Sequence, residues 1–324
     1  MDTERLTTLI ESSDLDELTR FIDGLASARD WDGIVTTRDR CREAVERGKQ
    51  VWAPAEFAEY RLARDAPGPY SAGVIGDGKG RYGLGPLWEV AASTHPWAEL
   101  EPHLDVSTTR AFAAHERVIR GEDLRGAEID EHILDLPLVL RPWEPEYPVA
   151  LYRADRADFP DERPVGMEWV DLGEPGVVVA DDGPADALME LVRPWWEDSS
   201  GHAEAIQVEG TALAAIRALG PHRARVTEVS LADALAAMVW AGASGGAYGR
   251  RRGTPAGRSG AWWVLAQLLG FDDFPDDPDD LAEAADLRWL LWDPGDRTGG
   301  WSLNLAVEDR DDRVAWTVSA VDMR

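Results

Sequence analysis

The chain has 324 residues and a formal net charge of -28, from 61 acidic residues against 33 lysines and arginines. This excess of carboxylates disfavours a general nucleic-acid-binding surface, because phosphate groups would be repelled. The hydrophobic fraction of 44% and the 15 tryptophans indicate a folded protein of one to three domains rather than a disordered acidic chain.

Cysteine and histidine usage narrows the chemistry further. Cys41 is the only cysteine, which excludes an intramolecular disulfide, a CxxC redox pair and a multi-cysteine zinc site. The six histidines form no HExxH or HxH pattern. We therefore expect no metal and no cofactor, and we expect Cys41 to be a small buried side chain inside a helix.

Two stretches bear on targeting. Residues 1–4 lack the basic region that opens a signal peptide. The longest uncharged stretch, Ala234–Gly249, is too short and too rich in glycine and serine to span a bilayer comfortably. These features predict a cytoplasmic protein with no membrane partner.

The first third of the chain is typical of short helices joined by tight loops. Ser13 is placed to cap a helix whose apolar residues recur at helical spacing, namely Leu15, Leu18, Ile22 and Leu25. Further helices are predicted at Trp31–Lys49, from Pro54 to the turn at Pro67, and at Leu84–Ala92, Trp97–Leu104 and Thr108–Ile119. We interpret residues 1–124 as a helical domain of stacked helical hairpins, for which a HEAT-like array is one form.

The pattern changes from about residue 125. Short apolar runs bounded by Pro, Asp and Gly predict strands or extended connections at Ile133–Leu140, Val149–Tyr152, Met167–Leu172, Val177–Ala180 and Val226–Val229. Helices are predicted at Ala185–Arg193, at Gly210–Leu219, after a capping box that begins at Ser230, near Gly260–Leu269 and near Leu281–Leu291.

The last strands are the clearest. Trp301–Val307 and Arg313–Val321 alternate apolar and polar residues around Glu308–Asp312, which predicts a β-hairpin. Together the patterns predict an α+β fold that is mainly α. Residues 125–324 would form a mixed domain with short strands and a C-terminal hairpin.

One stretch departs from the acidic trend of the molecule. No Asp or Glu occurs from Ala234 to Phe271, where the chain average would place about seven. Within it lies Gly245–Trp263, which we call the Arg/Gly segment, with arginines among glycines: Arg250, Arg251, Arg252 and Arg258.

The Arg/Gly segment has two interpretations. Glycines permit close approach of backbone N–H groups to an anion, and arginine donates bidentate hydrogen bonds to phosphate or carboxylate. The candidate ligand-binding residues are Tyr248, Gly249, Arg250, Arg251, Arg252 and Arg258. Alternatively, the segment is a packed or mobile connection whose arginines pair with the protein's own carboxylates.

The aromatic and acidic neighbours of this segment are equally open. Tyr248, Trp262 and Trp263 would stack on a ligand ring or pack in a core. The acidic connector, Asp272–Asp280, lacks the spacing of an EF-hand loop and is typical of an exposed linker. Its position also allows an intramolecular clamp on the arginines.

Two segments resemble a family of uncharacterised proteins from high-GC actinobacteria. They are Trp52–Tyr70 and the Arg/Gly segment. The resemblance implies a bacterial cytoplasmic protein, and it implies no activity and no site residues.

Three functions follow from these observations. The first is a non-enzymatic binding or regulatory protein whose Arg/Gly segment recognises an anionic small molecule or an acidic protein partner. The second is an enzyme acting on a phosphorylated or carboxylated small molecule held by the arginines. The third is an acidic inhibitor or immunity-type protein that covers a basic partner. The first is preferred because no nucleophile, metal set or cofactor motif accompanies the arginines.

Overall fold

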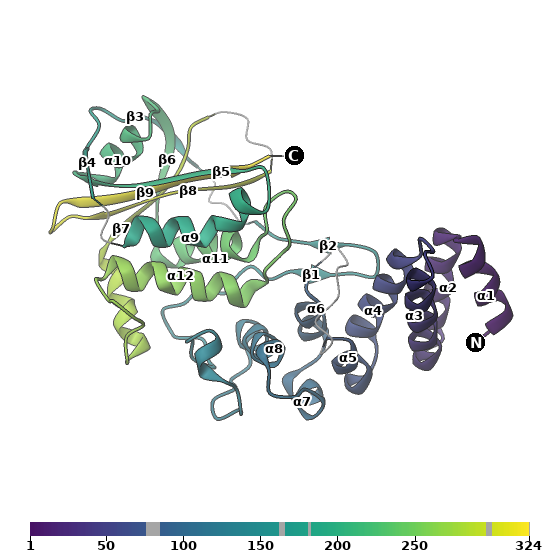
Figure 1. The fold of residues 1–324 in the computed structure, drawn as a ribbon. Coiled ribbons are helices and arrows are strands. Elements are labelled where there is room, and N and C mark those ends of the chain that lie inside the picture. The colour runs from purple at the N-terminus through teal and green to yellow at the C-terminus, as the bar shows by residue number, and fades with distance from the viewer. Residues whose placement is uncertain (76–84, 162–165, 181–182, 296–299, 324) are drawn as a thin grey trace. The chain divides into compact units, whose positions relative to one another are not determined.

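The computed structural model describes residues 1–75, 85–161, 166–180, 183–295 and 300–323 (Figure 1). Their contacts group them into two compact units. Unit 1 is Met1–Ile133 with Ala150–Asp158, and unit 2 is Leu134–Val149 with Phe159–Arg324. The predicted boundary after residue 124 concerns independently folding domains, and it stays a prediction.

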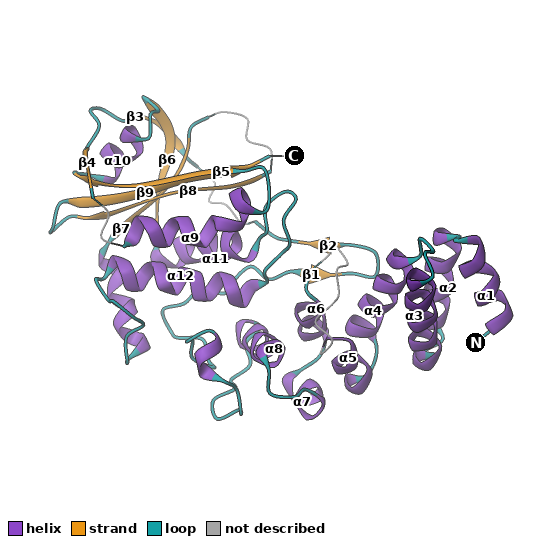
Figure 2. Cartoon of the chain, in the orientation of Figure 1, coloured by secondary structure: helices purple, strands orange, loops and turns teal. Residues whose placement is uncertain are grey.

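Unit 1 is built of short helices with one small two-stranded sheet (Figure 2). The helices are α1 Thr3–Ser12, α2 Leu15–Ser27, α3 Trp31–Glu46, α4 Trp52–Asp65, α5 Gly68–Ile75, α6 Leu87–Thr94, α7 Trp97–Leu100 and α8 Thr108–Ile119, with 3-10 turns at Glu101–His103 and Glu131–Ile133. The strands are β1 Leu151–Tyr152 and β2 Ala157–Asp158, which pair antiparallel. The predicted helical character of the chain through residue 121 is confirmed for the described part of that range, and a HEAT-like arrangement stays a prediction.

Aspartates start the first three helices. Asp2, Asp14 and Asp30 each accept a hydrogen bond from the backbone N–H three residues later. The prediction that Ser13 caps the second helix was wrong, because Ser13 has a left-handed backbone (φ 54°) and ends α1. Asp14 takes the capping role, since its side chain accepts from the N–H of Glu17.

Apolar side chains are buried in the interior of unit 1. Leu6, Leu18, Ile22 and Ile34 are fully buried. Cys41 is also fully buried inside α3, as predicted.

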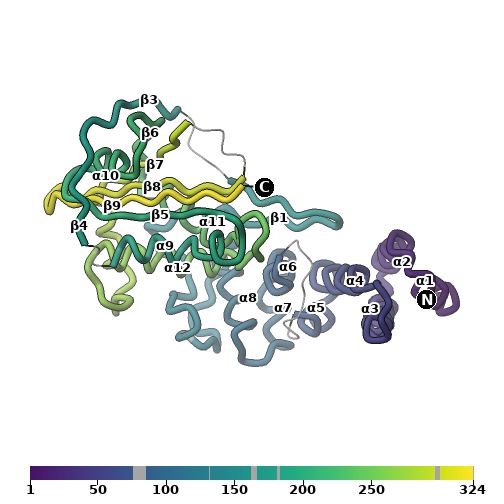
Figure 3. Tube along the Cα trace, turned by 45° about the horizontal axis from the view of Figure 1, so that its top comes forward, coloured from purple at the N-terminus to yellow at the C-terminus, as the bar shows by residue number. Residues whose placement is uncertain are grey.

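Unit 2 contains a seven-stranded antiparallel sheet in the order β3-β6-β7-β8-β9-β5-β4. The strands are β3 Glu168–Asp171, β4 Val177–Val179, β5 His202–Glu209, β6 Arg223–Val229, β7 Arg288–Asp293, β8 Trp301–Asp309 and β9 Val314–Asp322. The predicted hairpin is confirmed, since β8 pairs with β9 from Trp301 opposite Asp322 to Asp309 opposite Val314. It lies inside the larger sheet, beside β5 (Figure 3).

Helices cover both faces of this sheet. They are α9 Pro184–Glu197, α10 Ala212–Ala218, α11 Leu231–Ala243 and α12 Thr254–Leu268, with a 3-10 helix, η3, at Pro278–Asp286. Helices α9, α11 and α12 lie on one side and α10 on the other (Figures 1 and 2). A strand covered on both faces is buried at successive positions, as β8 is from Ser302 to Glu308.

That double burial explains one wrong prediction. The apolar run Leu281–Leu291 was predicted to be a helix, yet the chain forms η3 and then β7. Trp289, Leu290, Leu291 and Trp292 are buried one after another between β6 and β8. Such a run has no alternation, so its spacing does not distinguish a central strand from a helix.

Two further predictions concern residues of unit 2. Ser230 and Asp233 form the predicted capping box of α11, with hydrogen bonds in both directions. The run Ile133–Leu140 forms no strand. In the part of the chain that the structure describes, no helix is long and apolar enough to cross a membrane.

Candidate functional site

The Arg/Gly segment divides into two structurally different parts. Its first part is a loop, Ser244–Gly253, which follows α11. Its second part is the beginning of α12, which starts at Thr254 and not near Gly260 as predicted. The four candidate arginines are therefore separated, three in the loop and Arg258 in a helix.

The first turns of α12 pack closely against α11. A Cβ on Gly257 would lie 2.2 Å from the backbone oxygen of Val239 in α11, so only glycine fits there. Gly242 of α11 faces the same contact, since a Cβ on it would lie 3.0 Å from the Cα of Gly257. These glycines serve helix packing, whereas the sequence suggested a flexible loop.

The loop is fixed by an internal carboxylate. Asp322, at the end of β9, is fully buried, and its Oδ2 accepts a 2.5 Å hydrogen bond from the N–H of Ala247. Gly246 has a positive φ of 76°, and a Cβ on it would lie 2.2 Å from the same Oδ2. The turn of the loop therefore binds the Asp322 side chain of the protein itself.

The loop side chains have different surroundings. Arg250 is exposed, and Tyr248 is 66% exposed. The Arg251 guanidinium lies 4.7 Å from the centre of the Phe159 ring and donates to Thr254 Oγ1 at 3.2 Å. Gly249 is part of the tight turn, because a Cβ there would lie 2.0 Å from the Gly245 oxygen.

Arg252 is half-buried beside α9. Burial lowers the pKa of its guanidinium, the charge of Glu190 raises it, and the like charge of Arg193 lowers it. Arg193 itself pairs with Glu190 at 3.0 Å and with Glu197 at 3.6 Å. Among the described residues, the Arg252 guanidinium has no ion-pair or hydrogen-bond partner.

Arg258 lies in the core of unit 2. Its guanidinium forms a bidentate pair with Glu144, with both N–O distances 2.7 Å, and both side chains are fully buried. It also donates to the backbone oxygens of Pro137 and Val139 at 3.1 and 3.3 Å. These hydrogen bonds use four of the five N–H donors of the buried guanidinium.

Glu144 collects further donors around the same pair. Tyr147 Oη donates to it at 2.7 Å, and Trp262 Nε1 donates at 3.1 Å. Burial, and then the charge of Glu144, raises the pKa of Tyr147 well above its usual range. The network fastens the irregular segment Leu134–Val149 to α12.

The aromatic and acidic neighbours are partnered within unit 2. Trp262 is buried and Trp263 packs edge-on against Phe274 with ring centres 5.6 Å apart. In the acidic connector, Asp279 accepts from Arg141 Nε at 2.8 Å and from Trp143 Nε1 at 3.2 Å. The connector's described ion pair is therefore with Arg141 and not with a loop arginine.

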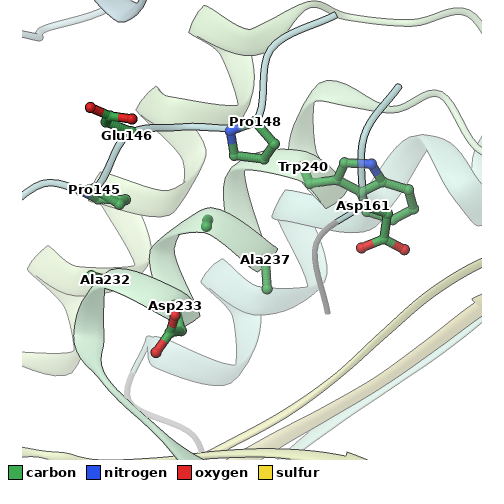
Figure 4. Close-up of a pocket in the computed structure, with 9 residues that line it drawn as sticks. Pro145, Glu146, Pro148, Asp161, Ala232, Asp233, Ala237 and Trp240 are labelled. Atoms are coloured by element: carbon green, nitrogen blue, oxygen red, sulfur yellow. The ribbon is translucent and has the colours of Figure 1, made fainter. Parts of the chain in front are cut away.

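A pocket on α11 is the site that sequence analysis missed. It has a volume of about 140 Å³ and is lined by Pro145, Glu146, Pro148, Asp161, Ala232, Asp233, Ala236, Ala237 and Trp240 (Figure 4). The sequence contained one signal, since alanines at four- and five-residue spacing leave a shallow helix face. It contained none for the pairing of this face with residues 145–148, which are about 90 positions away in the chain.

Unit 1 also holds polar groups that the sequence did not single out. Glu89 is fully buried and accepts from Tyr152 Oη at 2.6 Å. Arg120 donates to Glu116 at 2.8 Å and to the oxygen of Ala150 at 2.8 Å. A cavity of about 180 Å³ adjoins them, lined by Ser93, Thr94, Arg120, Ala150, Leu151, Tyr152 and Arg153.

No set of three or more His, Cys, Asp or Glu residues in the described part of the chain is arranged to hold a metal ion. The chain matches the DUF6183 family, a family of unknown function, over residues 16–324. It therefore belongs to that family. No curated protein and no solved structure matches the chain.

Proposed function

We propose that this DUF6183 protein is a non-enzymatic binding protein that recognises an anionic ligand or an acidic partner. The recognition surface, which we call the arginine surface, consists of Tyr248, Arg250 and Arg252. Arg258 has no part in it, because its guanidinium is buried and paired with Glu144.

The state of Arg252 carries this proposal. A half-buried guanidinium loses hydration, which lowers its pKa; the charge of Glu190 opposes this effect and the like charge of Arg193 adds to it. An anion bound at this position would offset the part of the cost that Glu190 does not. In a chain of net charge -28, most arginines are expected to have a carboxylate partner. Among the described residues, the Arg252 guanidinium has no ion-pair or hydrogen-bond partner.

The fixed loop supports the same conclusion. Asp322 and the glycine turn hold the backbone, so a ligand would not have to order the loop on binding. The exposed Tyr248 ring provides an aromatic face two residues before Arg250 in the same loop. Arg251, stacked on Phe159, adds positive charge without a new ordering cost.

The other two functions considered are an enzymatic activity and the binding of a basic partner. The enzymatic function stays a prediction, and neither cavity described above is lined by a loop arginine. The binding of a basic partner also stays a prediction. A cytoplasmic location and an actinobacterial source belong to the proposal, and they rest on composition and on the resemblance alone.

A charge-matched pair of variants tests the proposal. The test variant is Arg250→Gln with Arg252→Gln. The control is Arg29→Gln with Arg47→Gln, two exposed arginines of unit 1. Titration with inorganic phosphate, citrate and a hexaglutamate peptide, at low and at physiological salt, measures affinity for each protein.

We expect at least one probe to bind wild type, and the test variant to lose about tenfold in affinity while the control changes less than about twofold. Binding should weaken with salt. Equal loss in both variants, or no binding of any probe to wild type, would contradict the proposal. Unchanged thermal unfolding shows that the variants are folded.

A further inference from the structure

We propose that His95 and Thr94 form a proton-sensitive switch between the ends of α4 and α6. When the imidazole is charged, the Thr94 hydroxyl binds the last turn of α4. When the imidazole is neutral, that hydroxyl turns to the ring and releases α4. The inference is independent of the arginine surface, because all the residues of the switch belong to unit 1.

The position of His95 brings two helix ends to one ring. His95 is the C-cap of α6 and is 6% exposed. Its Nδ1 lies 3.0 Å from the backbone oxygen of Ala91, in the last turn of α6, and its Nε2 lies 2.7 Å from the backbone oxygen of Ala66, the C-cap of α4. The partial negative charge of the helix ends favours a charged ring, whereas burial favours a neutral one.

The observed arrangement satisfies every group when both ring nitrogens carry a proton. The backbone oxygens of Ala66 and Ala91 only accept hydrogen bonds, so each requires an N–H from the ring. Thr94 Oγ1 donates to the backbone oxygen of Arg64 at 2.7 Å. The same Oγ1 lies 3.0 Å from His95 Nδ1, where it is free to accept because its single hydrogen is directed to Arg64.

Loss of one proton requires a rearrangement of these bonds. Nε2 keeps its proton, because the Ala66 oxygen has only lone pairs to offer. Nδ1 gives its proton to solvent, which reaches the exposed Thr94, and becomes an acceptor. The Thr94 hydroxyl is the donor beside it, and since that group has one hydrogen, it must leave the Arg64 oxygen to bind Nδ1.

The exchange changes α4 and leaves α6 intact. The Ala91 oxygen still accepts from the backbone N–H of His95 at 3.0 Å, whereas the Arg64 oxygen loses its bond to Thr94. Helices α4 and α6 pack against each other, so the lost bond is a tie between neighbouring helices. Thr94 also lines the cavity of about 180 Å³ in unit 1. The charge of a buried ring is thereby linked to the wall of that cavity.

The charged and titratable groups of the elements packed around this junction have partners of their own. Among the described residues, none of them hydrogen-bonds to the His95 ring. They are Arg64 with Asp65 on α4, Tyr70 of α5 with Asp32, Glu89 of α6 with Tyr152 of β1, Glu99 of α7 with the N–H of Gly68, and Arg117 of α8 with Glu122.

Nuclear magnetic resonance of the isotope-labelled full chain tests the switch. The ¹⁵N shifts of the His95 ring report which nitrogens carry protons, and the ¹³C shift of the Arg64 carbonyl reports its hydrogen bond. Both are followed from about pH 5 to about pH 9, with the exposed His103 as an internal control.

Two valine substitutions separate the switch from a general effect of threonine. Thr94→Val removes the hydroxyl that the switch requires. Thr19→Val is the matched control, since Thr19 is an exposed helical threonine whose hydroxyl donates to Leu15 of its own helix at 2.9 Å. Circular dichroism shows that both variants are folded.

We expect the Arg64 carbonyl of wild type to shift with the same midpoint as the His95 ring nitrogens, and the neutral ring to carry its proton on Nε2. Thr94→Val should lose the carbonyl shift and Thr19→Val should keep it. Four results would overturn the proposal: a neutral ring protonated on Nδ1, no change in the protonation of His95 over this range, an Arg64 carbonyl that does not respond in wild type, or one that still responds in Thr94→Val. The first three need wild type alone.

Discussion

Arg258 and the arginines of the loop lie within nine positions of each other, yet they occupy opposite environments. Arg258 is fully buried with Glu144, whereas Arg250 is exposed and Arg252 is half-buried without a described partner. The residue type and the glycine-rich neighbourhood are the same. The difference arises because α12 begins at Thr254, which turns Arg258 into a core position.

The comparison teaches that helix packing decides the role of a charged residue. Gly257 lets α12 approach α11 so closely that the next residue, Arg258, is enclosed by the segment Leu134–Val149. The loop before Thr254 has no such cover. One stretch of sequence therefore contributes both to the core and to the surface.

The largest effect on stability is expected when the buried Arg258–Glu144 pair is broken. Arg258→Ala leaves the Glu144 carboxylate buried without its counter-charge, which should lower the free energy of unfolding by about 3–5 kcal/mol. Arg250→Ala should change it by less than about 0.5 kcal/mol, because that side chain is exposed. Urea unfolding followed by circular dichroism measures both.

A double substitution sharpens this result. Arg258→Met with Glu144→Gln removes both charges together and should recover part of the lost stability. If Arg258→Ala and Arg250→Ala had equally small effects, the contrast between the two positions would fail.

The next effect concerns the close approach of α11 and α12. Gly257→Ala places a Cβ 2.2 Å from the Val239 oxygen and should destabilise unit 2 by about 1–3 kcal/mol. Gly24→Ala is the matched helical control, since no atom lies within 4 Å of its added Cβ. That change should stabilise by about 0.5–1 kcal/mol. Thermal unfolding of both variants gives the signs, and two stabilised proteins would contradict the packing argument.

The smallest effect is a pH dependence in unit 1, where burial disfavours ionisation of the Cys41 thiol more than the charge of Arg40 favours it. Burial raises the pKa of its thiol from 9.0 to about 11. The folded protein favours the neutral thiol, so this contribution to stability is complete below pH 9.0 and is lost as the pH rises towards 11. Tyr147, whose pKa is also raised, adds loss of the same sign at still higher pH.

Cys41→Ala isolates the thiol from the tyrosine. The difference in unfolding free energy between wild type and this variant should shrink from pH 8 to pH 11, because only wild type loses the thiol contribution. A difference that stays constant over this range would show that Cys41 ionises as easily in the folded chain as in the unfolded one.

Local patterns were enough to predict many elements. Periodicity placed most of the helices of residues 1–121, though not α1 or α5, together with the capping box at Ser230 and the β8–β9 hairpin, since each depends on neighbours in sequence. Local patterns gave wrong predictions in two places. One is Leu281–Leu291, where a strand buried on both faces lacks alternation, and the other is the start of α12, where glycines pack against another helix.

The candidate sites depended on contacts that no local pattern contains. Nothing near Arg258 in sequence indicates Glu144, 114 positions away, or the backbone oxygens that also accept from its guanidinium. Nothing near Gly246 indicates Asp322. The sequence identified the unusual segment correctly as a feature, and only the fold separated its buried arginine from its exposed ones.

The strand order has a consequence for biosynthesis. β8 and β9 lie in the middle of the sheet, yet they follow all its other strands in the chain. While the ribosome adds residues in order, β7 and β5 must wait with unpaired edges until this hairpin emerges, a state in which edge-to-edge aggregation threatens. Asp322 arrives with the same hairpin, so the loop carrying Arg250 and Arg252 gains this buried anchor only when synthesis of the sheet is finished. A nascent chain stalled before residue 301 would therefore display these arginines on an unanchored loop.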